Sequence, residues 1–395
     1  MEELLFLSHR IPYPPNKGDK IRSYHLLKHL ARNFKIHLGT FIDDPEDWQH
    51  AQSLKEFVAG EMLLLPLDPT KAKLRSCYGF LSGEPLSVPY YRDSKLQYWV
   101  DQLIANRPVN NVLVFSSAMS QYVTAHQNLR RIIDFVDIDS DKWRQYSERK
   151  SWPMNWIYRR EARSLFAFEQ RIAQTFNAST FVSRAEAELF KKLAPQCANK
   201  ITYFNNGVDL DYFSPAHDNE NPYPIGNRAL VFTGAMDYWA NVDAASWFAR
   251  EVFPDLRAQF PDLRFYIVGS RPAEAVLALA DESIIVTGSV PDVRPYVAHA
   301  EISVAPLRIA RGIQNKVLEA MAMAKTVVVS PQALEGIDAE INSEVILANN
   351  AADFASCIAA QLIQPDAKLG QAARKRMIQN YSWENSLKPL ERLFA

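Results

Sequence analysis

The sequence predicts an α/β fold made of two doubly wound domains that face each other across a cleft. Short apolar runs alternate with amphipathic helical segments along almost all of the 395 residues. Fully apolar strands between helices are typical of parallel sheets covered on both faces. The alternation breaks once, over 206–228, where Asn, Asp, Pro and Gly are dense and periodicity is weak. This segment is typical of an interdomain linker, and the length of the chain also favours two domains.

The composition narrows the function classes. Hydrophobic residues make up 48% and charged residues 23% of the chain, which are globular values. The net charge is -1, with 44 basic and 45 acidic residues, which argues against a general nucleic-acid binder. Three widely spaced cysteines favour neither a disulfide framework nor a zinc site. Because no signal peptide or apolar run of about 18 residues is present, we expect a cytoplasmic protein with at most peripheral contact at the inner membrane face.

The first predicted domain covers 1–205. A helix is expected in the segment KIRSYHLLKHLARNF, where Ile21, Tyr24 and Leu27 share one face, and a longer helix over about 154–175. Its strands are expected at 4–8, 35–42, 61–67, 111–117 and 131–138, with a further strand-to-helix step at STFVSRAEAELFKKL.

The second predicted domain covers 229–375. It contains a helix near 241–259, and 376–395 end the chain in an amphipathic helix that could cross back to the N-terminal domain. Its strands are expected at ALVFTGAM, LRFYIVGS, SIIVTGSV, ISVAPL and TVVVSP. In such sheets ligands bind on the loops at the carboxyl ends of the strands.

The segment ARGIQNKVLEAMAMAKTVVVSP is the most informative part of the second domain. A loop containing Gly312 leads into a helix that begins near Asn315, and the free N–H groups of a helix start favour an anion such as a diphosphate. Arg311 and Lys316 would add positive charge there. Glu319 lies one turn further along the same face and suits the two hydroxyls of a ribose. A capped surface helix with solvated charges explains this segment alone equally well.

The wider sequence favours the first of these interpretations. GIQNKVLEAMAMAKTVVVSP closely resembles the nucleotide-sugar segment of retaining glycosyltransferases of family four, which have the GT-B architecture. The resemblance implies that Glu319, the glutamate of LEAMA, binds the donor ribose. It covers most of the chain and is close to a subgroup of bacterial sugar transferases associated with exopolysaccharides. It extends to VFTGAMDYWANVDAASWFAREVFP, FYIVGS, VTGSVPDVRPYVAHAEISVAPL, YSWENSL, RIPYPPNKGDKIRSYHLLKHLA and NNGVDLDYFSP.

Two departures from the family pattern concern the diphosphate and the sugar. Family members usually carry a second glutamate eight positions before the ribose glutamate, where this chain has Arg311. Many also have Arg and Lys after the first strand of the second domain, but TGAMDYWAN offers neither. A departing diphosphate needs positive charge, and we infer that Arg308, Arg311 and Lys316 supply it. Recognition of the donor sugar is left unassigned.

The loop YPPNKGDKIR follows the first strand of the first domain. Gly18 permits a tight turn or a close approach to a ligand. Lys17, Lys20 and Arg22 could meet a phosphate or an anionic acceptor, and Asn16 lies beside them. The resemblance implies that this loop closes over the sugar and phosphates. The alternative is an ordinary basic loop between a strand and a helix.

Asp137 and Asp139 end a strand of the first domain and could contact acceptor or donor hydroxyls. A metal-binding interpretation of this Asp-Ile-Asp sequence is disfavoured, since its usual setting is a single mixed sheet rather than two parallel ones. A strand-end cap or a salt bridge to Lys142 is the favoured alternative.

Histidines and tryptophans of the first domain are further candidates. His9 follows the first strand, and a histidine often lies in the cleft in this family, whereas His25 and His29 are expected on the surface. Three tryptophans, favoured as core residues, could instead form a platform for an acceptor: Trp143, Trp152 and Trp156.

We therefore expect a retaining hexosyl-type glycosyltransferase that needs no metal or cofactor and acts in exopolysaccharide or cell-surface glycan biosynthesis. Its partners would be a nucleotide-sugar donor and a saccharide or lipid-linked saccharide acceptor, with no nucleic acid. The alternatives are a degenerate GT-B protein that only binds nucleotide or acts as a scaffold, and a GT-B enzyme of another chemistry, such as an epimerase or an inverting transferase. The expected catalytic residues are Lys316, Arg311 and Asp137; the donor-binding residues are Gly18, Gly234, Gly288, Val290, Arg308, Gly312, Ile313, Gln314, Asn315 and Glu319; the acceptor-side residues are Asn16, Lys17 and Asp139.

Overall fold

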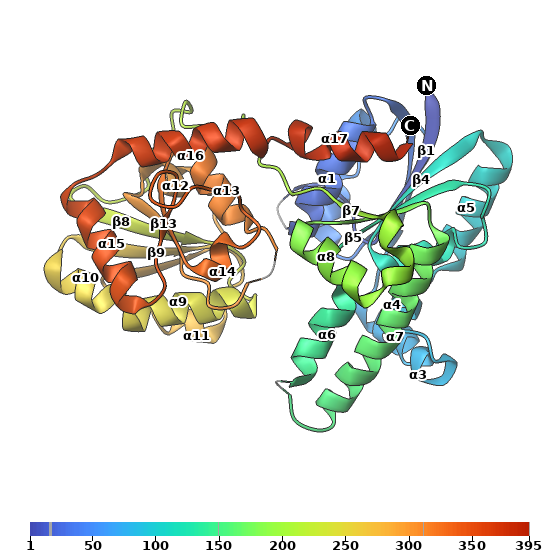
Figure 1. Cartoon of the computed structure of the whole chain (residues 1–395), viewed down its shortest axis with the longest axis horizontal. Helices are drawn as coiled ribbons and strands as arrows, with labels where there is room; N and C mark the ends of the chain where they lie inside the picture. Colours follow the sequence, from blue (N-terminus) through green and yellow to red (C-terminus); the bar gives the residue numbers. More distant parts are fainter. Residues whose placement is uncertain (16–17, 149, 311, 395) are drawn as a thin grey trace. The chain divides into compact units, whose positions relative to one another are not determined.

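The computed structural model describes residues 1–15, 18–148, 150–310 and 312–394 (Figure 1). The chain divides into two compact units. One contains Met1–Asn205 together with the C-terminal residues from Leu387, and the other contains Asn206–Ser386. Each unit holds one sheet in which all the paired strands run parallel. The predicted α/β class with two parallel sheets is confirmed.

The first unit has a seven-stranded sheet in the order β3-β2-β1-β4-β5-β6-β7. Four consecutive residues of the first strand, Leu4 to Leu7, are 0% exposed, so helices and loops cover both faces of the sheet. The strands are β1 (Glu2–Ser8), β2 (Phe34–Ile42), β3 (Met62–Pro66), β4 (Val109–Phe115), β5 (Arg130–Val136), β6 (Ala178–Phe181) and β7 (Ile201–Tyr203).

Two helices of the first unit, α6 and α7, lie side by side and extend away from the sheet (Figure 1). The helices are α1 (Gly18–Leu30), α2 (Pro69–Ser76), α3 (Tyr78–Ser82), α4 (Ser87–Tyr90), α5 (Ser94–Asn106), α6 (Asp139–Glu148), α7 (Met154–Thr175) and α8 (Arg184–Leu193). Short 3-10 helices span Pro45–His50, Ser53–Glu56, Ser117–Tyr122 and Pro195–Lys200.

The second unit has a six-stranded sheet in the order β10-β9-β8-β11-β12-β13. Its strands are β8 (Arg228–Thr233), β9 (Leu263–Val268), β10 (Ile284–Gly288), β11 (Ile302–Ala305), β12 (Thr326–Val329) and β13 (Ile346–Leu347). Its helices are α9 (Trp239–Glu251), α10 (Phe253–Gln259), α11 (Glu274–Leu277), α12 (Arg294–His299), α13 (Asn315–Ala322), α14 (Pro331–Leu334), α15 (Ala351–Ile363) and α16 (Ala367–Asn380), followed by α17 (Trp383–Phe394).

Three local features differ from the sequence prediction. The helix expected near 241–259 is divided into α9 and α10 at Val252, because Pro254 cannot donate a helical hydrogen bond and fits the first turn of a new helix. The edge strands β7 and β13 were not predicted, since they are only three and two residues long and carry no periodic signal.

Helix α1 is buried on most of its sides, which corrects the expectation for its histidines. His25 and His29 are 8% and 6% exposed and do not lie on the surface. His29 Nε2 lies 2.9 Å from a carboxylate oxygen of Glu391 on α17, which packs on this unit. Arg130 also donates to the Phe394 carbonyl at 2.9 Å. The end of α17 therefore contacts His29, which the sequence alone placed on the surface.

Candidate functional site

The second sheet changes direction at β8, which lies between β9 and β11. In open parallel sheets the loops after such neighbouring strands diverge and leave a crevice at their carboxyl ends, where ligands bind. The loop after β8 contains Gly234, and the loop after β11 leads into α13. The fold therefore places the two predicted donor segments beside each other.

Lys316 of α13 reaches the end of β8. Its Nζ donates to Asn241 Oδ1 at 2.6 Å and lies 4.2 Å from the centre of the Phe232 ring. A Cβ atom on Gly234 would lie only 2.9 Å from this Nζ and 2.8 Å from Asn241 Nδ2. Asn241 Nδ2 in turn donates to the Ala235 carbonyl at 2.8 Å. The Lys316 ammonium is thus held against the loop after β8, whose segment TGAMDYWAN contains no basic residue.

Glycines let the ends of three neighbouring strands approach closely. Gly234 and Gly269 have φ values of 150° and 157°, and Gly288 has a φ of 70°, all in regions that favour glycine. A Cβ on Gly269 would lie 1.6 Å from the Gly234 carbonyl oxygen, and the Gly269 N–H donates to Gly288 O at 3.2 Å. The ends of β8, β9 and β10 therefore present backbone rather than bulky side chains. Val290, two residues further, is half-buried.

The start of α13 carries no side-chain cap. Gln314 occupies the N-cap position without capping the helix, and its Nε2 donates to the Gly312 carbonyl at 3.1 Å. Gly312 has a φ of 64°, while Ile313 is anchored in the core at 7% exposed. Asn315 Oδ1 accepts from Asn206 Nδ2 at 3.2 Å. An uncapped helix start with its positive dipole end is suited to an anion.

Lys316 and Glu319 form the electrostatic centre of the site. They lie three residues apart on α13, hence on the same face, and both are half-buried. Burial lowers the pKa of Lys316 to about 7, against the opposing effect of the Glu319 charge. Burial also raises the pKa of Glu319 to about 7, which the Lys316 charge opposes. Two groups that titrate near neutrality at a strand-end crevice are typical of functional sites.

The other predicted cations are arranged differently. Arg308 is exposed and forms a two-bond ion pair with Asp243 of α9, at 2.9 and 2.5 Å. A phosphate would have to compete with this carboxylate for the guanidinium. Arg311 lies outside the described residues. The geometry therefore brings Lys316, rather than Arg308, to the end of β8.

Sequence reasoning missed Asn241 and Asn206, which contact Lys316 and Asn315. It also missed Arg271, whose Nε lies 3.1 Å from Asp237 in the loop after β8. Asn241 belongs to the segment TGAMDYWAN, but its hydrogen bond with Lys316 is apparent only from the tertiary structure.

In the first unit, Lys142 occupies the position between Asp137 and Asp139. Its Nζ donates to Asp137 Oδ2 at 2.8 Å and to Asp139 Oδ1 at 3.1 Å. Although burial by itself lowers the pKa of this ammonium, the two carboxylates raise it above the ordinary value. The geometry thus matches the favoured salt-bridge alternative. Among the described residues no group of three or more His, Cys, Asp or Glu could hold a metal ion.

Two basic residues predicted to bind a phosphate or an anionic acceptor, Lys20 and Arg22, are buried. Lys20 is 1% exposed and donates to Asp47 at 2.5 Å, and Arg22 is 0% exposed and donates to Asp134 at 2.7 Å. Their interpretation as phosphate or acceptor ligands was wrong, because both charges are paired inside the core. Gly18 begins α1, and a Cβ there would meet no atom within 4 Å. Asn16 and Lys17 lie outside the described residues.

His9 lies directly after β1, which neighbours β4 where the first sheet changes direction. Its Nε2 is 3.5 Å from Asp19 Oδ2, and its ring stacks on Phe115 with centroids 5.8 Å apart. Among the described residues its buried Nδ1 has no hydrogen-bond partner. Burial alone would raise the pKa of Asp19, but His9 and Arg10 hold it well below the ordinary value.

The three tryptophans behave differently from one another. Trp143 packs against Tyr158, with ring centroids 5.1 Å apart. Trp152 and Trp156 are 80% and 57% exposed, so the favoured core interpretation was wrong for these two.

Comparisons with known proteins agree with this architecture. Residues 227–364 match the family described as Glycosyl transferases group 1. No curated protein sequence matches the chain. Among the described residues there is no helix that is both long and apolar enough to cross a membrane.

Solved structures share the fold over the whole chain. A sucrose-phosphate synthase from Thermosynechococcus elongatus is 15% identical, with a TM-score of 0.74 over 100% of this chain and 98% of that chain. Anabaena HepE in complex with UDP and glucose is 13% identical, with a TM-score of 0.69 over 100% and 99%. WaaG, a glycosyltransferase involved in lipopolysaccharide biosynthesis, is 14% identical, with a TM-score of 0.65 over 99% and 98%. The two Rossmann-like units therefore have the GT-B fold.

Proposed function

We propose that the protein is a retaining glycosyltransferase that uses a nucleotide-sugar donor. The observation that carries the proposal is the Lys316–Glu319 pair at the direction change of the second sheet. The match of residues 227–364 to Glycosyl transferases group 1 supports it, and so does the likeness to HepE, which was solved with UDP and glucose.

In the proposed complex the donor diphosphate lies against the start of α13. The uncapped N–H groups and the Lys316 ammonium would meet its negative charge, and Glu319 would accept hydrogen bonds from the ribose hydroxyls. The open space beside Gly288, where a Cβ would meet no atom within 4 Å, would let the nucleotide approach the backbone at the end of β10. Arg308 could join only by leaving Asp243, while Arg311 remains a predicted contributor.

The transfer would break the bond between the anomeric carbon and the diphosphate oxygen. The acceptor oxygen would form its bond on the same face of the sugar, and its proton would pass to the departing diphosphate oxygen. No metal or other cofactor is proposed. The chain would supply positioning and stabilisation of the developing charge, each worth several kcal/mol in enzymes of this kind.

The acceptor is proposed to be a saccharide or lipid-linked saccharide, as in cell-surface glycan or exopolysaccharide synthesis. The likeness to WaaG supports this class, because that enzyme is involved in lipopolysaccharide biosynthesis. Asp137 and Asp139 could reach an acceptor only if Lys142 released them. A cytoplasmic location is part of the same proposal.

The donor site can be tested by thermal shift of the purified protein with UDP-, GDP-, ADP- and dTDP-sugars. A ligand that binds only the folded state at about 100 times its Kd adds about 2.7 kcal/mol of stability. We expect one nucleotide to raise Tm in the wild type and to raise it clearly less in Glu319→Gln. Glu335→Gln, an exposed glutamate elsewhere in the second unit, is the control and should keep the full shift. Absence of any shift in a folded wild type would favour a scaffold protein.

The His9–Asp19 pair favours one second candidate, an inverting transferase of the same fold. A histidine oriented by a carboxylate can remove a proton from an acceptor hydroxyl, which inversion requires. With the donor identified, NMR of the product distinguishes the two: an unchanged anomeric configuration supports retention. An inverted one, together with loss of turnover in His9→Gln, supports the second candidate.

A further inference from the structure

Large apolar side chains gather on one part of the first unit. The group, here called the aromatic surface, comes from two stretches that are separate in sequence, 69–82 and 150–163. Leu81, Trp152 and Leu74 are 85%, 80% and 71% exposed, so these side chains are not part of the core. The members of the aromatic surface are Leu74, Tyr78, Phe80, Leu81, Trp152, Met154 and Trp156.

The two stretches form one fixed surface. The rings of Phe80 and Trp156 stack with centroids 6.4 Å apart, and the Arg160 guanidinium lies 5.1 Å from the Phe80 ring centre. Arg160 also donates to the Gly79 carbonyl. These contacts join α3 to α7, which extends away from the sheet in Figure 1. The Phe80 and Trp156 rings are therefore held together without a partner, and this contact joins the two stretches.

The same two stretches are strongly basic. They contain seven basic residues and a single acidic one, although the whole chain has a net charge of -1. The acidic residue, Glu161, is 2% exposed, and its carboxylate accepts from the Leu86 N–H at 2.8 Å. Glu161 also pairs with Arg160 at 3.3 Å, and Asp68, directly before the first stretch, lies 3.8 Å from Lys71. These two acids offset two of the seven basic residues, so the stretches keep a positive net charge. The basic residues are Lys71, Lys73, Arg75, Lys150, Arg159, Arg160 and Arg163.

We propose that the aromatic surface docks the protein onto an anionic lipid bilayer. Tryptophan and tyrosine favour the boundary between headgroups and acyl chains, and apolar residues on a basic element bury there. Lysine and arginine can place their charges among anionic headgroups while their stems lie along apolar surface. The aromatic residues and arginines would suit a protein partner as well, but the three lysines of the two stretches favour a bilayer, because protein interfaces are depleted in lysine. The inference goes beyond sugar transfer and does not depend on it.

The proposal is tested by co-sedimentation of the full chain with vesicles, without donor or acceptor. One set contains phosphatidylcholine alone, and the other contains equal parts of phosphatidylcholine and phosphatidylglycerol. An apolar variant combines Leu81→Ser with Trp152→Ser, and a charge variant combines Lys71→Glu, Lys73→Glu and Lys150→Glu. These side chains are exposed, so folding should be preserved and is checked by circular dichroism.

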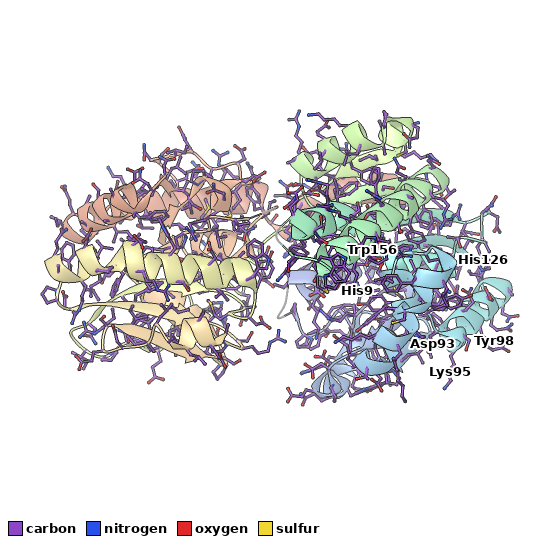
Figure 2. The ribbon with its side chains drawn as sticks, turned by 90° about the horizontal axis from the view of Figure 1, so that it is seen from below. His9, Asp93, Lys95, Tyr98, His126 and Trp156 are labelled. Atoms are coloured by element: carbon purple, nitrogen blue, oxygen red, sulfur yellow. The ribbon has the colours of Figure 1, made fainter. Side chains whose placement is uncertain are left out.

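Matched controls change exposed residues outside the surface. Tyr98→Ser alters an aromatic residue on α5 that is 68% exposed and lies apart from Trp156 in Figure 2, and Lys368→Glu reverses a charge on α16. We expect the wild type and both controls to bind the anionic vesicles, and each surface variant to bind them at least about tenfold more weakly. Binding should also weaken as salt is added. Wild type that stays in the supernatant, or surface variants that bind as well as the controls, would overturn the proposal.

Discussion

The proposed contact between Lys316 and the diphosphate predicts that Lys316→Met loses affinity in a way that depends on pH. In the free protein burial lowers the pKa of the Lys316 ammonium to about 7, so a large share of it is neutral above that pH. A bound diphosphate favours the charged form, because an opposite charge at close range stabilises the ammonium. Binding should therefore be coupled to proton uptake by Lys316 when the pH exceeds 7.

The size of the effect follows from this titration. A hydrogen bond to a charged group contributes about 2 kcal/mol, so at pH 6 the variant should bind the nucleoside diphosphate about 30-fold more weakly. At pH 8 the wild type must first protonate Lys316, which costs about 1.4 kcal/mol, or tenfold in affinity. The ratio of the Kd values of variant and wild type should thus fall to about threefold at pH 8. The titration of the ligand itself cancels in this ratio.

Isothermal titration calorimetry from pH 6 to pH 8 measures both Kd values with the nucleotide chosen by thermal shift. Because Glu319 also has a pKa of about 7, the same comparison is made between Glu319→Gln and the double variant with Lys316→Met. The ratio should keep its fall with pH in this background. A ratio that stays constant across the range, or that rises with pH, would refute the assignment of Lys316 to the diphosphate.

Two further predictions concern stability. Gly269→Ala should lower the free energy of unfolding of the second unit by about 3 kcal/mol or more, since its Cβ would overlap the Gly234 carbonyl. Gly226→Ala, in open space at a φ of 85°, should lower it by only about 1–2 kcal/mol. Equal urea midpoints of the two variants would contradict this prediction. Glu169 is buried against Ser140, and burial raises its pKa to about 8. Between about pH 4.5 and pH 8 the folded state therefore holds a proton that the unfolded state releases. The free energy of unfolding should fall as the pH rises through this window. Glu169→Gln cannot titrate and should gain stability relative to wild type from pH 5 to pH 8 in urea unfolding; a constant difference would exclude this titration.

The sequence by itself determined the α/β class and the positions of most strands. Apolar runs such as LLFLS are buried on both faces, so their hydrophobicity carries the signal without help from distant residues. It also placed Lys316 and Glu319 on one face of a helix after a strand, since helical spacing is a local property. Their proposed roles came from the chemistry of the helix start together with the resemblance to known transferases, and they stay predictions.

Only the tertiary structure decided which charges lie at the end of a strand and which are paired in the core. Arg22 pairs with Asp134 across 112 positions of sequence, and Lys316 meets Asn241 across 75. Phe80 and Trp156 likewise meet only because α3 packs on α7. A local pattern records the side chain and its neighbours on one element, but burial and pairing depend on which elements the fold brings together. The chemistry of a basic residue such as Arg22 is therefore set by partners that its own segment does not contain.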